Sequence, residues 1–197
     1  MDKPFAPACE RNQAFILDVL RPHFADRTQV LEIGSGTGQH AVHFAAAMPH
    51  LVWQTSEIAA HLPGIQLWLD EARLPNTPPP LSFDIKGPAP TVTFDAIFSA
   101  NTLHIMGWAE VQTLFAALPA LMRERALLTV YGPFNYAGRF TSASNAAFDA
   151  KLRTDDPQRG IRDFEAVDAL ARAAGLTLLD DRAMPANNRC ITWRRAP

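Results

Sequence analysis

Three glycines stand at alternate positions directly after an apolar segment of the chain. Residues 30–38 read Val-Leu-Glu-Ile-Gly-Ser-Gly-Thr-Gly, so the glycines are Gly34, Gly36 and Gly38. Glycine accepts backbone turns that other residues cannot, and it lets a ligand approach the backbone closely. A glycine turn between a first parallel strand and a helix is typical of cofactor-binding α/β proteins. We therefore expect these glycines to bind a cofactor, the alternative being a turn without a ligand.

The acidic residue in the same segment indicates the kind of cofactor. Glu32 lies two positions before Gly34, where its charge would repel a pyrophosphate but tolerate a cation. S-adenosylmethionine carries a sulfonium and an ammonium group, and it therefore fits better than a dinucleotide. A dinucleotide fingerprint would also place glycine or alanine where this chain has Gln39.

Two further acids follow the next predicted strands. Glu57 comes directly after the predicted strand 51–56, and a carboxylate there can accept hydrogen bonds from both hydroxyls of an adenosine ribose. Asp84 lies near the end of the predicted strand 81–85, where its carboxylate could accept a hydrogen bond from the adenine amine. The backbone N–H of Ile85 would then donate to a ring nitrogen of the same base. The alternative is that both acids only cap loops.

Polar residues after the predicted strand 94–99 could handle the molecule that accepts a methyl group. Asn101 and His104 both lie in this segment. Histidine titrates near neutral pH and is a common general base, so His104 is the candidate catalytic residue. Asn101 is a further candidate cofactor ligand. The alternative is that these two residues hold the loop or cap the next helix.

The elements that would position these residues alternate between helix and strand signals. This alternation is typical of a parallel sheet with helices on both faces. Apolar periodicity, prolines and glycines predict helices at 9–21, 38–48, 63–72, 108–122, 144–152 and 164–174. The predicted strands are 29–33, 51–56, 81–85, 94–99 and 126–131, followed by 176–179 and 190–193. The last two are close in sequence and should pair antiparallel.

Length and composition indicate one folded domain. The chain has 197 residues, of which 48% are apolar and 19% charged, as in globular proteins. We expect a single domain over 1–197, with an N-terminal helical segment at 1–28 and a lid-like insert at 132–162. The net charge of −2 argues against a nucleic acid as partner and leaves a small molecule as the expected substrate.

Several features favour a cytoplasmic protein without a membrane partner or a metal ion. Cys9 and Cys190 are far apart in sequence and form neither a disulfide framework nor a metal motif. We expect no signal peptide, because the first ten residues contain no long apolar run, and no segment approaches the roughly 20 apolar residues that span a bilayer. The histidines at 40, 43 and 50 are expected to lie on or beyond a solvated helix face rather than to bind a metal.

The chain resembles the class I S-adenosylmethionine-dependent methyltransferases, and most closely a bacterial family of methyltransferase-like proteins of unknown function. The resemblance runs nearly from end to end and includes residues 7–12, 30–38, 100–105, 131–136, 139–142, 144–149 and 160–163. It implies a Rossmann-like α/β fold with a mostly parallel seven-stranded sheet, helices on both faces and an antiparallel last strand. It also implies that Glu32 and the glycines hold the methionine end of the cofactor, Glu57 the ribose and Asp84 the adenine.

The acceptor side is less defined. The Asn-Pro-Pro-Tyr signature of amino-group methyltransferases is absent, since residues 101–104 read Asn-Thr-Leu-His, which weakens a base-methylating role. Arg11, Asn135, Tyr136 and Arg139 lie in polar segments that are expected to converge over the cofactor and bind the acceptor. The expected function is thus S-adenosylmethionine-dependent methyl transfer. The alternatives are a non-catalytic S-adenosylmethionine-binding protein and a NAD-dependent oxidoreductase.

Overall fold

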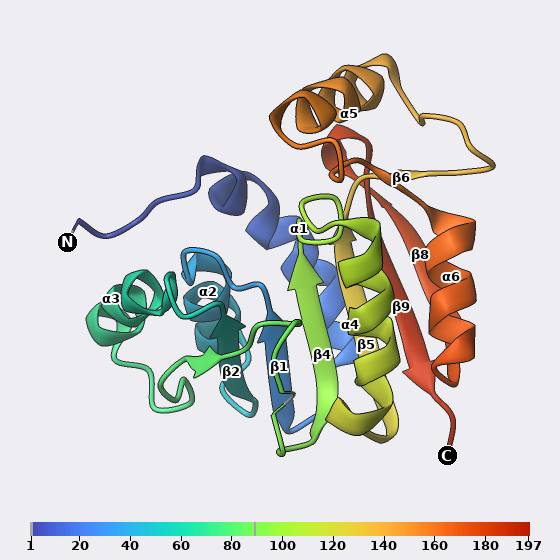
Figure 1. The fold of residues 1–197 in the computed structure, drawn as a ribbon. Coiled ribbons are helices and arrows are strands. Elements are labelled where there is room, and N and C mark those ends of the chain that lie inside the picture. The colour runs from blue at the N-terminus through green and yellow to red at the C-terminus, as the bar shows by residue number, and fades with distance from the viewer. Residues whose placement is uncertain (1, 89) are drawn as a thin grey trace.

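A seven-stranded sheet forms the centre of the protein, whose computed structural model describes residues 2–88 and 90–197 (Figure 1). The strand order is β3-β2-β1-β4-β5-β9-β8. Neighbours from β3 to β5 pair in parallel, whereas β9 runs antiparallel to both β5 and β8. The strands are β1 (Gln29–Ile33), β2 (Val52–Glu57), β3 (Leu81–Ser82), β4 (Phe94–Ala100), β5 (Met122–Gly132), β8 (Leu176–Met184) and β9 (Asn188–Arg195). The predicted sheet with its antiparallel last strand is confirmed.

Helices cover both faces of this sheet, also as predicted. The described residues form α1 (Pro7–His23), α2 (Gln39–Ala47), α3 (Leu62–Ala72), α4 (Trp108–Leu121), α5 (Ala143–Asp155) and α6 (Phe164–Ala173). The helices α1 and α2 pack on one face around Phe44, Trp53 and Phe98. The helices α4 and α6 pack on the other face around Phe115 and Trp193. Burial of these large side chains is the main force that holds the layers together.

The segment predicted as an insert leaves the sheet after β5. It forms β6 (Phe134–Asn135) and α5, and it returns through β7 (Arg162–Asp163), which pairs in parallel with β6. The helix α5 lies beyond the end of the sheet to which β4 points (Figure 1). The Ser142 hydroxyl accepts a hydrogen bond of 3.1 Å from the Asn145 N–H, which caps the first turn of α5. The Asn145 amide donates to the Asn187 carbonyl at 3.1 Å, and this fixes α5 to the β8–β9 turn.

Some element boundaries differ from the predicted ones. The first helix starts at Pro7, because proline suits a first helical turn, and it continues through Pro22. The helix α4 passes Pro119 and ends two residues later. The strand β3 has two residues instead of five. Asp163 stands at the N-cap position of α6, but its side chain makes no capping hydrogen bond.

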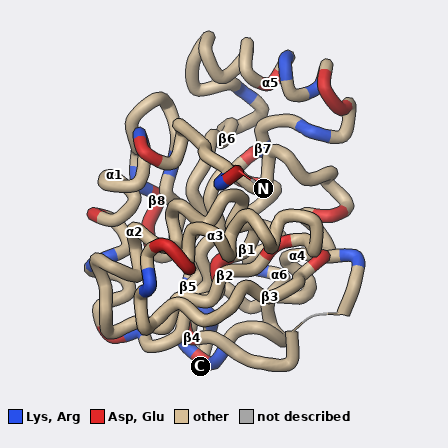
Figure 2. The backbone as a smooth tube through the Cα atoms, turned by 90° about the vertical axis from the view of Figure 1, so that its left-hand side faces the viewer, with Lys and Arg blue, Asp and Glu red and all other residues tan. Residues whose placement is uncertain are grey.

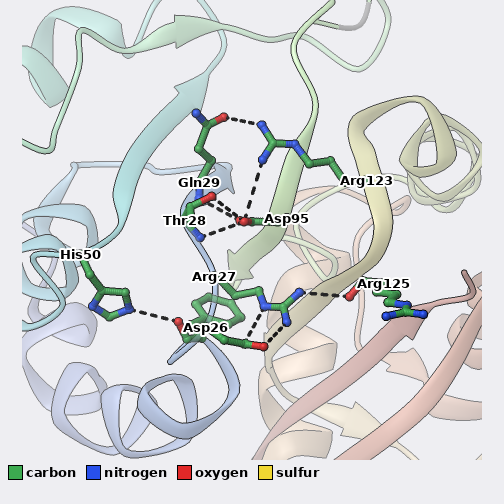
Figure 3. A network of polar contacts seen from close by, with 9 residues as sticks. Asp26, Arg27, Thr28, Gln29, His50, Asp95, Arg123 and Arg125 are labelled. Atoms are coloured by element: carbon green, nitrogen blue, oxygen red, sulfur yellow. Dashed lines mark hydrogen bonds and ion pairs between the residues drawn. The ribbon is translucent and has the colours of Figure 1, made fainter.

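A polar network fastens the start of β1 to the start of β4 (Figure 3). The Asp95 carboxylate accepts hydrogen bonds from the Thr28 N–H at 2.9 Å, the Thr28 hydroxyl at 2.6 Å and the Gln29 N–H at 2.8 Å. Hydrogen bonds to a charged acceptor are stronger than those between neutral groups. The network therefore secures the amino-terminal edge of the sheet, whereas the opposite edge, at the carboxyl ends of the strands, faces the cavities described below.

Candidate functional site

A cleft runs along the carboxyl ends of β1, β2 and β3. It consists of a larger chamber of about 720 Å³ and a smaller chamber of about 430 Å³. Both volumes lie in the range of small-molecule sites, roughly 300–1,000 Å³. The chambers adjoin, because they share the lining residues Gly34, Glu57, His61, Thr102 and Ile105.

The glycine loop borders the larger chamber, and its three glycines have different roles. Gly34, Gly36 and Gly38 all have positive φ angles, of 71°, 56° and 91°. A Cβ atom on Gly34 would lie 2.8 Å from the Thr102 hydroxyl, and one on Gly38 would lie 3.2 Å from Ile65 Cγ2. A Cβ on Gly36 would meet no atom within 4 Å. Gly34 and Gly36 line the chamber, whereas Gly38 does not and instead lets α2 approach α3.

Glu57, Asp84 and Ile85 lie along the cleft as predicted by their positions at strand ends. Glu57 lines both chambers, and its Oε2 contacts the Ile58 N–H and, at 3.3 Å, the ring of His61. Since both contacts use Oε2, Oε1 remains for a ligand. Asp84 and Ile85 line the smaller chamber, together with Gly34 of the glycine loop.

Glu32, which the sequence predicts to hold the methionine end of the cofactor, lines neither chamber. Its side chain is 1% exposed, and Oε2 accepts a hydrogen bond of 3.0 Å from the Trp53 indole. Burial raises the pKa of Glu32 to about 7, although hydrogen bonds from Trp53 and Ser35 oppose this rise. Cys9 lines the larger chamber, and burial, followed by the nearby Glu32 charge, raises the pKa of its thiol to about 11. Glu32 is thus a buried acid next to the chamber wall.

His104 also lies outside the cleft. It is 6% exposed, and its ring packs against Phe148 of α5 with the centroids 5.4 Å apart. Burial, followed by the nearby Arg162 charge, lowers the pKa of His104 to about 4. The chain turns at Asn101, where φ is 57°, so that Asn101 lines the larger chamber and His104 faces α5. The geometry does not support His104 as a general base.

Three residues that the sequence predicts to bind the methyl acceptor lie outside the cavities. The Tyr136 hydroxyl donates a hydrogen bond of 2.7 Å to Asp181, and its ring stacks on Phe164. Asn135 is buried, and its Oδ1 has no hydrogen-bond partner among the described residues. Arg139 is exposed, and its backbone pairs with Tyr136. None of the three lines any of the cavities described in this section.

Arg11 lines a third cavity of about 430 Å³, which we name the side cavity. Its walls come from α1, from the ends of β4 and β5 and from the β8–β9 turn, and they comprise Ala8, Arg11, Asn12, Phe15, Asn101, Tyr131, Pro185, Ala186 and Asn188. Ala8 and Asn101 belong to the larger chamber as well, so the two cavities adjoin. Of these residues, sequence reasoning named Arg11 and Asn101 but missed Tyr131, although Tyr131 ends a predicted strand.

The N-terminal segment Asp2–Ala6, here called the strap, contributes to the wall of the larger chamber. Asp2, Pro4 and Ala6 line it. The Trp68 indole donates a hydrogen bond of 2.7 Å to the Pro4 carbonyl. The Lys3 ammonium lies 2.6 Å from the Glu71 carboxylate and 3.8 Å from the centre of the Trp68 ring. No local sequence signal pointed to the strap, because its partners lie 33 to 68 positions away in the chain.

An arginine that the sequence analysis did not name lines the smaller chamber. Arg159 lies in the segment between α5 and β7 and lines this chamber together with Lys86 and Glu110. The insert therefore reaches the adenine end of the predicted cofactor site through Arg159 rather than through Asn135, Tyr136 or Arg139.

Other features bear on the kinds of partner. The acidic and basic positions are interspersed along the backbone rather than gathered on one side (Figure 2). Across residues 2–88 and 90–197, no helix has the length and apolar character to cross a membrane. The same residues contain no group of three or more His, Cys, Asp and Glu side chains that could hold a metal ion.

The fold is that of S-adenosylmethionine-dependent methyltransferases. A structure of an O-methyltransferase family protein from Burkholderia thailandensis matches with a TM-score of 0.82 at 16% identity, over 96% of this chain and 57% of that chain. The S-adenosylmethionine-dependent methyltransferase SibL matches with a TM-score of 0.81 at 22% identity, over 96% and 56%. Human N-acetylserotonin methyltransferase, solved in complex with SAM, matches with a TM-score of 0.77 at 15% identity, over 96% and 53%. The chain thus spans little more than half the length of these proteins.

A family model agrees with the extent of the fold. The model described as "Protein of unknown function (DUF938)" matches residues 3–195, which is nearly the whole chain. The chain therefore belongs to the DUF938 family.

Proposed function

We propose that this protein is an S-adenosylmethionine-dependent methyltransferase that acts on a small-molecule acceptor. The observation that carries the proposal is the order of groups along the cleft. The glycine loop follows β1, Glu57 ends β2, and Asp84 with Ile85 follows β3, and these strands are neighbours in the order β3-β2-β1. The glycine loop leaves room for a ligand beside its backbone, and the Glu57 carboxylate can accept hydrogen bonds from two ribose hydroxyls. The Asp84 carboxylate and the Ile85 N–H can then accept from and donate to the edge of a purine.

The charges of the larger chamber favour a cation. Its lining includes the acids Asp2 and Glu57 and, among the described residues, no lysine or arginine. His40 also lines it, and burial lowers the pKa of this histidine to about 4, so that its ring is neutral at pH 7. A positively charged ligand would therefore meet an acidic chamber.

S-adenosylmethionine, when bound, supplies a methyl group that its sulfonium already activates. The residues of this chain would then mainly orient the two reactants and exclude water, and orientation alone is worth several kcal/mol. The strap covers part of the larger chamber, and Ile105 adds an apolar wall shared by both chambers. No protein base is required if the acceptor atom has no proton to lose at neutral pH.

Calorimetric titration with S-adenosylhomocysteine tests the cofactor assignment. Wild-type protein should bind it, and a ligand at about 100 times its Kd should add roughly 2.7 kcal/mol to the free energy of unfolding. Glu57→Gln should weaken binding about 10- to 100-fold, because a charged acceptor is lost. Glu124→Gln, an exposed acid outside the three cavities, is the control and should bind like wild type. Absence of binding would refute the proposal.

Transfer is measured separately from binding. The protein is incubated with S-adenosylmethionine that carries a labelled methyl group and with a mixture of small metabolites. The label should then appear in a product other than the donor. Binding without transfer across a wide mixture would favour the non-catalytic alternative. NADH fluorescence tests the remaining alternative. If the protein binds NADH and not S-adenosylhomocysteine, the oxidoreductase is favoured.

A further inference from the structure

We infer that the side cavity is the acceptor site and that it takes a small organic acid with a flat apolar body, its carboxylate bound to Arg11. The inference rests on the proposed function, since an acceptor must reach the bound methyl donor. It goes further by naming the chemical class of the acceptor and the residue that recognises it.

The position of the side cavity suits an acceptor. It shares the lining residues Ala8 and Asn101 with the larger chamber, so the two cavities adjoin. Asn101 holds a left-handed backbone with φ of 57°, and its N–H donates a hydrogen bond of 2.8 Å to the Tyr131 carbonyl. This bond joins the ends of β4 and β5 at the point where the cavities meet.

The charge of the side cavity is opposite to that of the larger chamber. Arg11 is the only charged residue among the described residues that line it. Arg11 is exposed, and within residues 2–88 and 90–197 it forms no ion pair. A guanidinium binds a carboxylate with two parallel hydrogen bonds. One arginine balances a single negative charge, which favours a carboxylate over a phosphate.

The shape and surface of the side cavity favour a flat apolar body. Phe15 lies one helical turn after Arg11 on α1 and is 48% exposed. Pro185 and Ala186 form part of the wall contributed by the β8–β9 turn. An exposed aromatic ring beside an unpaired cation matches a ligand with an apolar ring and an anionic end.

The remaining wall is polar and held in place. Tyr131, Asn12 and Asn188 all line the cavity. Asn12 in turn lies 2.7 Å from the His40 ring of the larger chamber. These groups can bind a hydroxyl or amine substituent on the ring of the acid.

Ligand-observed NMR on the protein, with and without saturating S-adenosylhomocysteine, tests the inference. The probes are benzoate, 4-hydroxybenzoate, phenylacetate and cinnamate, each compared with its amide. At least one acid should bind 10-fold or more tightly than its amide. Arg11→Met should weaken binding of that acid roughly 10- to 100-fold, and Arg11→Lys should restore part of it. Arg21→Met removes the same charge from α1 outside the cavity and should change nothing.

The outcomes separate the two proposals. If S-adenosylhomocysteine binds but no acid exceeds its amide, or if Arg11→Met binds the acid as wild type does, the acceptor inference is wrong and the cofactor assignment stands. If S-adenosylhomocysteine does not bind, the proposed function fails, and with it the acceptor role. If an acid still binds through Arg11 in that case, the side cavity is an anion site but not the acceptor site of a methyltransferase. Unchanged melting temperatures and S-adenosylhomocysteine affinities would show that the Arg11 variants remain folded.

Discussion

The Trp53 indole donates a hydrogen bond of 3.0 Å to the Glu32 carboxyl group, and this pair lies buried between neighbouring strands β1 and β2. One hydrogen bond offsets only part of the loss of water around the carboxylate, which is why burial raises the pKa of Glu32 to about 7. The acid is therefore close to half-protonated at neutral pH, directly beside the larger chamber.

The first prediction concerns the pH dependence of stability. The pKa of Glu32 rises from 4.5 to about 7 on folding, so the folded state binds the proton more strongly than the unfolded chain does. The free energy of unfolding should consequently fall as pH rises through this window, by about 3 kcal/mol in all. Glu32→Gln should remove that loss, making the variant more stable than wild type at pH 8 and similar at pH 5. Urea unfolding at both pH values measures this.

Glu124→Gln is the control for that experiment, because Glu124 is exposed and should leave the pH dependence as it is. If Glu32→Gln lowers the stability equally at pH 5 and pH 8, the ionisation of Glu32 does not cause the pH dependence, and the prediction is wrong.

The second prediction links the same acid to ligand binding. A cation bound in the larger chamber favours the ionised form of a nearby carboxyl group and lowers its pKa. Binding of S-adenosylmethionine at pH 7 should therefore release up to about half a proton from Glu32. Calorimetry in buffers with different ionisation enthalpies counts the released protons. The Glu32→Gln variant should release fewer, and an equal count in both proteins would contradict the prediction.

The third prediction separates ligand contact from backbone strain in the glycine loop. Gly36 and Gly175 have φ angles of 56° and 77°, and a Cβ on either would meet no atom within 4 Å. Alanine at either position should reduce stability by a similar amount, roughly 1–2 kcal/mol. Only Gly36 lines a chamber, so only Gly36→Ala should weaken S-adenosylhomocysteine binding, by about 10-fold or more. Thermal unfolding and titration calorimetry on the pair distinguish the two effects; equal affinities would exclude a ligand at Gly36.

The fourth prediction concerns the strap. A Cβ on Gly64 would lie 2.8 Å from Pro4 Cγ, so Gly64→Ala should displace the strap. Alanine also favours the helix α3 by up to about 1 kcal/mol, and the ligand-free protein should be no less stable. Trp68→Phe removes the hydrogen bond to the Pro4 carbonyl without altering a residue of the chamber wall. Both variants should release S-adenosylhomocysteine several-fold faster in stopped-flow experiments, and unchanged rates would show that the strap does not retain the ligand.

The sheet and the course of the cleft could be predicted from the sequence because local signals determine them. Alternating strand and helix patterns predict a parallel sheet, and the carboxyl ends of its strands share one edge. Glu57 ends β2 and Asp84 lies two residues after β3, so their places along the cleft follow from the topology. The glycine loop is equally local.

The other site residues depend on contacts that no local pattern reveals. Residues 30–33 are buried on both faces, so alternation alone does not say to which side Glu32 points. Tyr136 is held by Asp181, which lies 45 positions later in the chain. The direction of His104 depends on the left-handed turn at Asn101, and left-handed backbones at residues other than glycine are uncommon.

The hydrogen bonds that Asp95 accepts from Thr28 and Gln29 lie at the foot of the sheet, whereas the cleft lies at its tip. The contacts that hold β1 and β4 together and the residues that line the cleft thus lie at opposite ends of the sheet. A protein engineer could rebuild the walls that select a substrate while the fastening of the framework stays untouched.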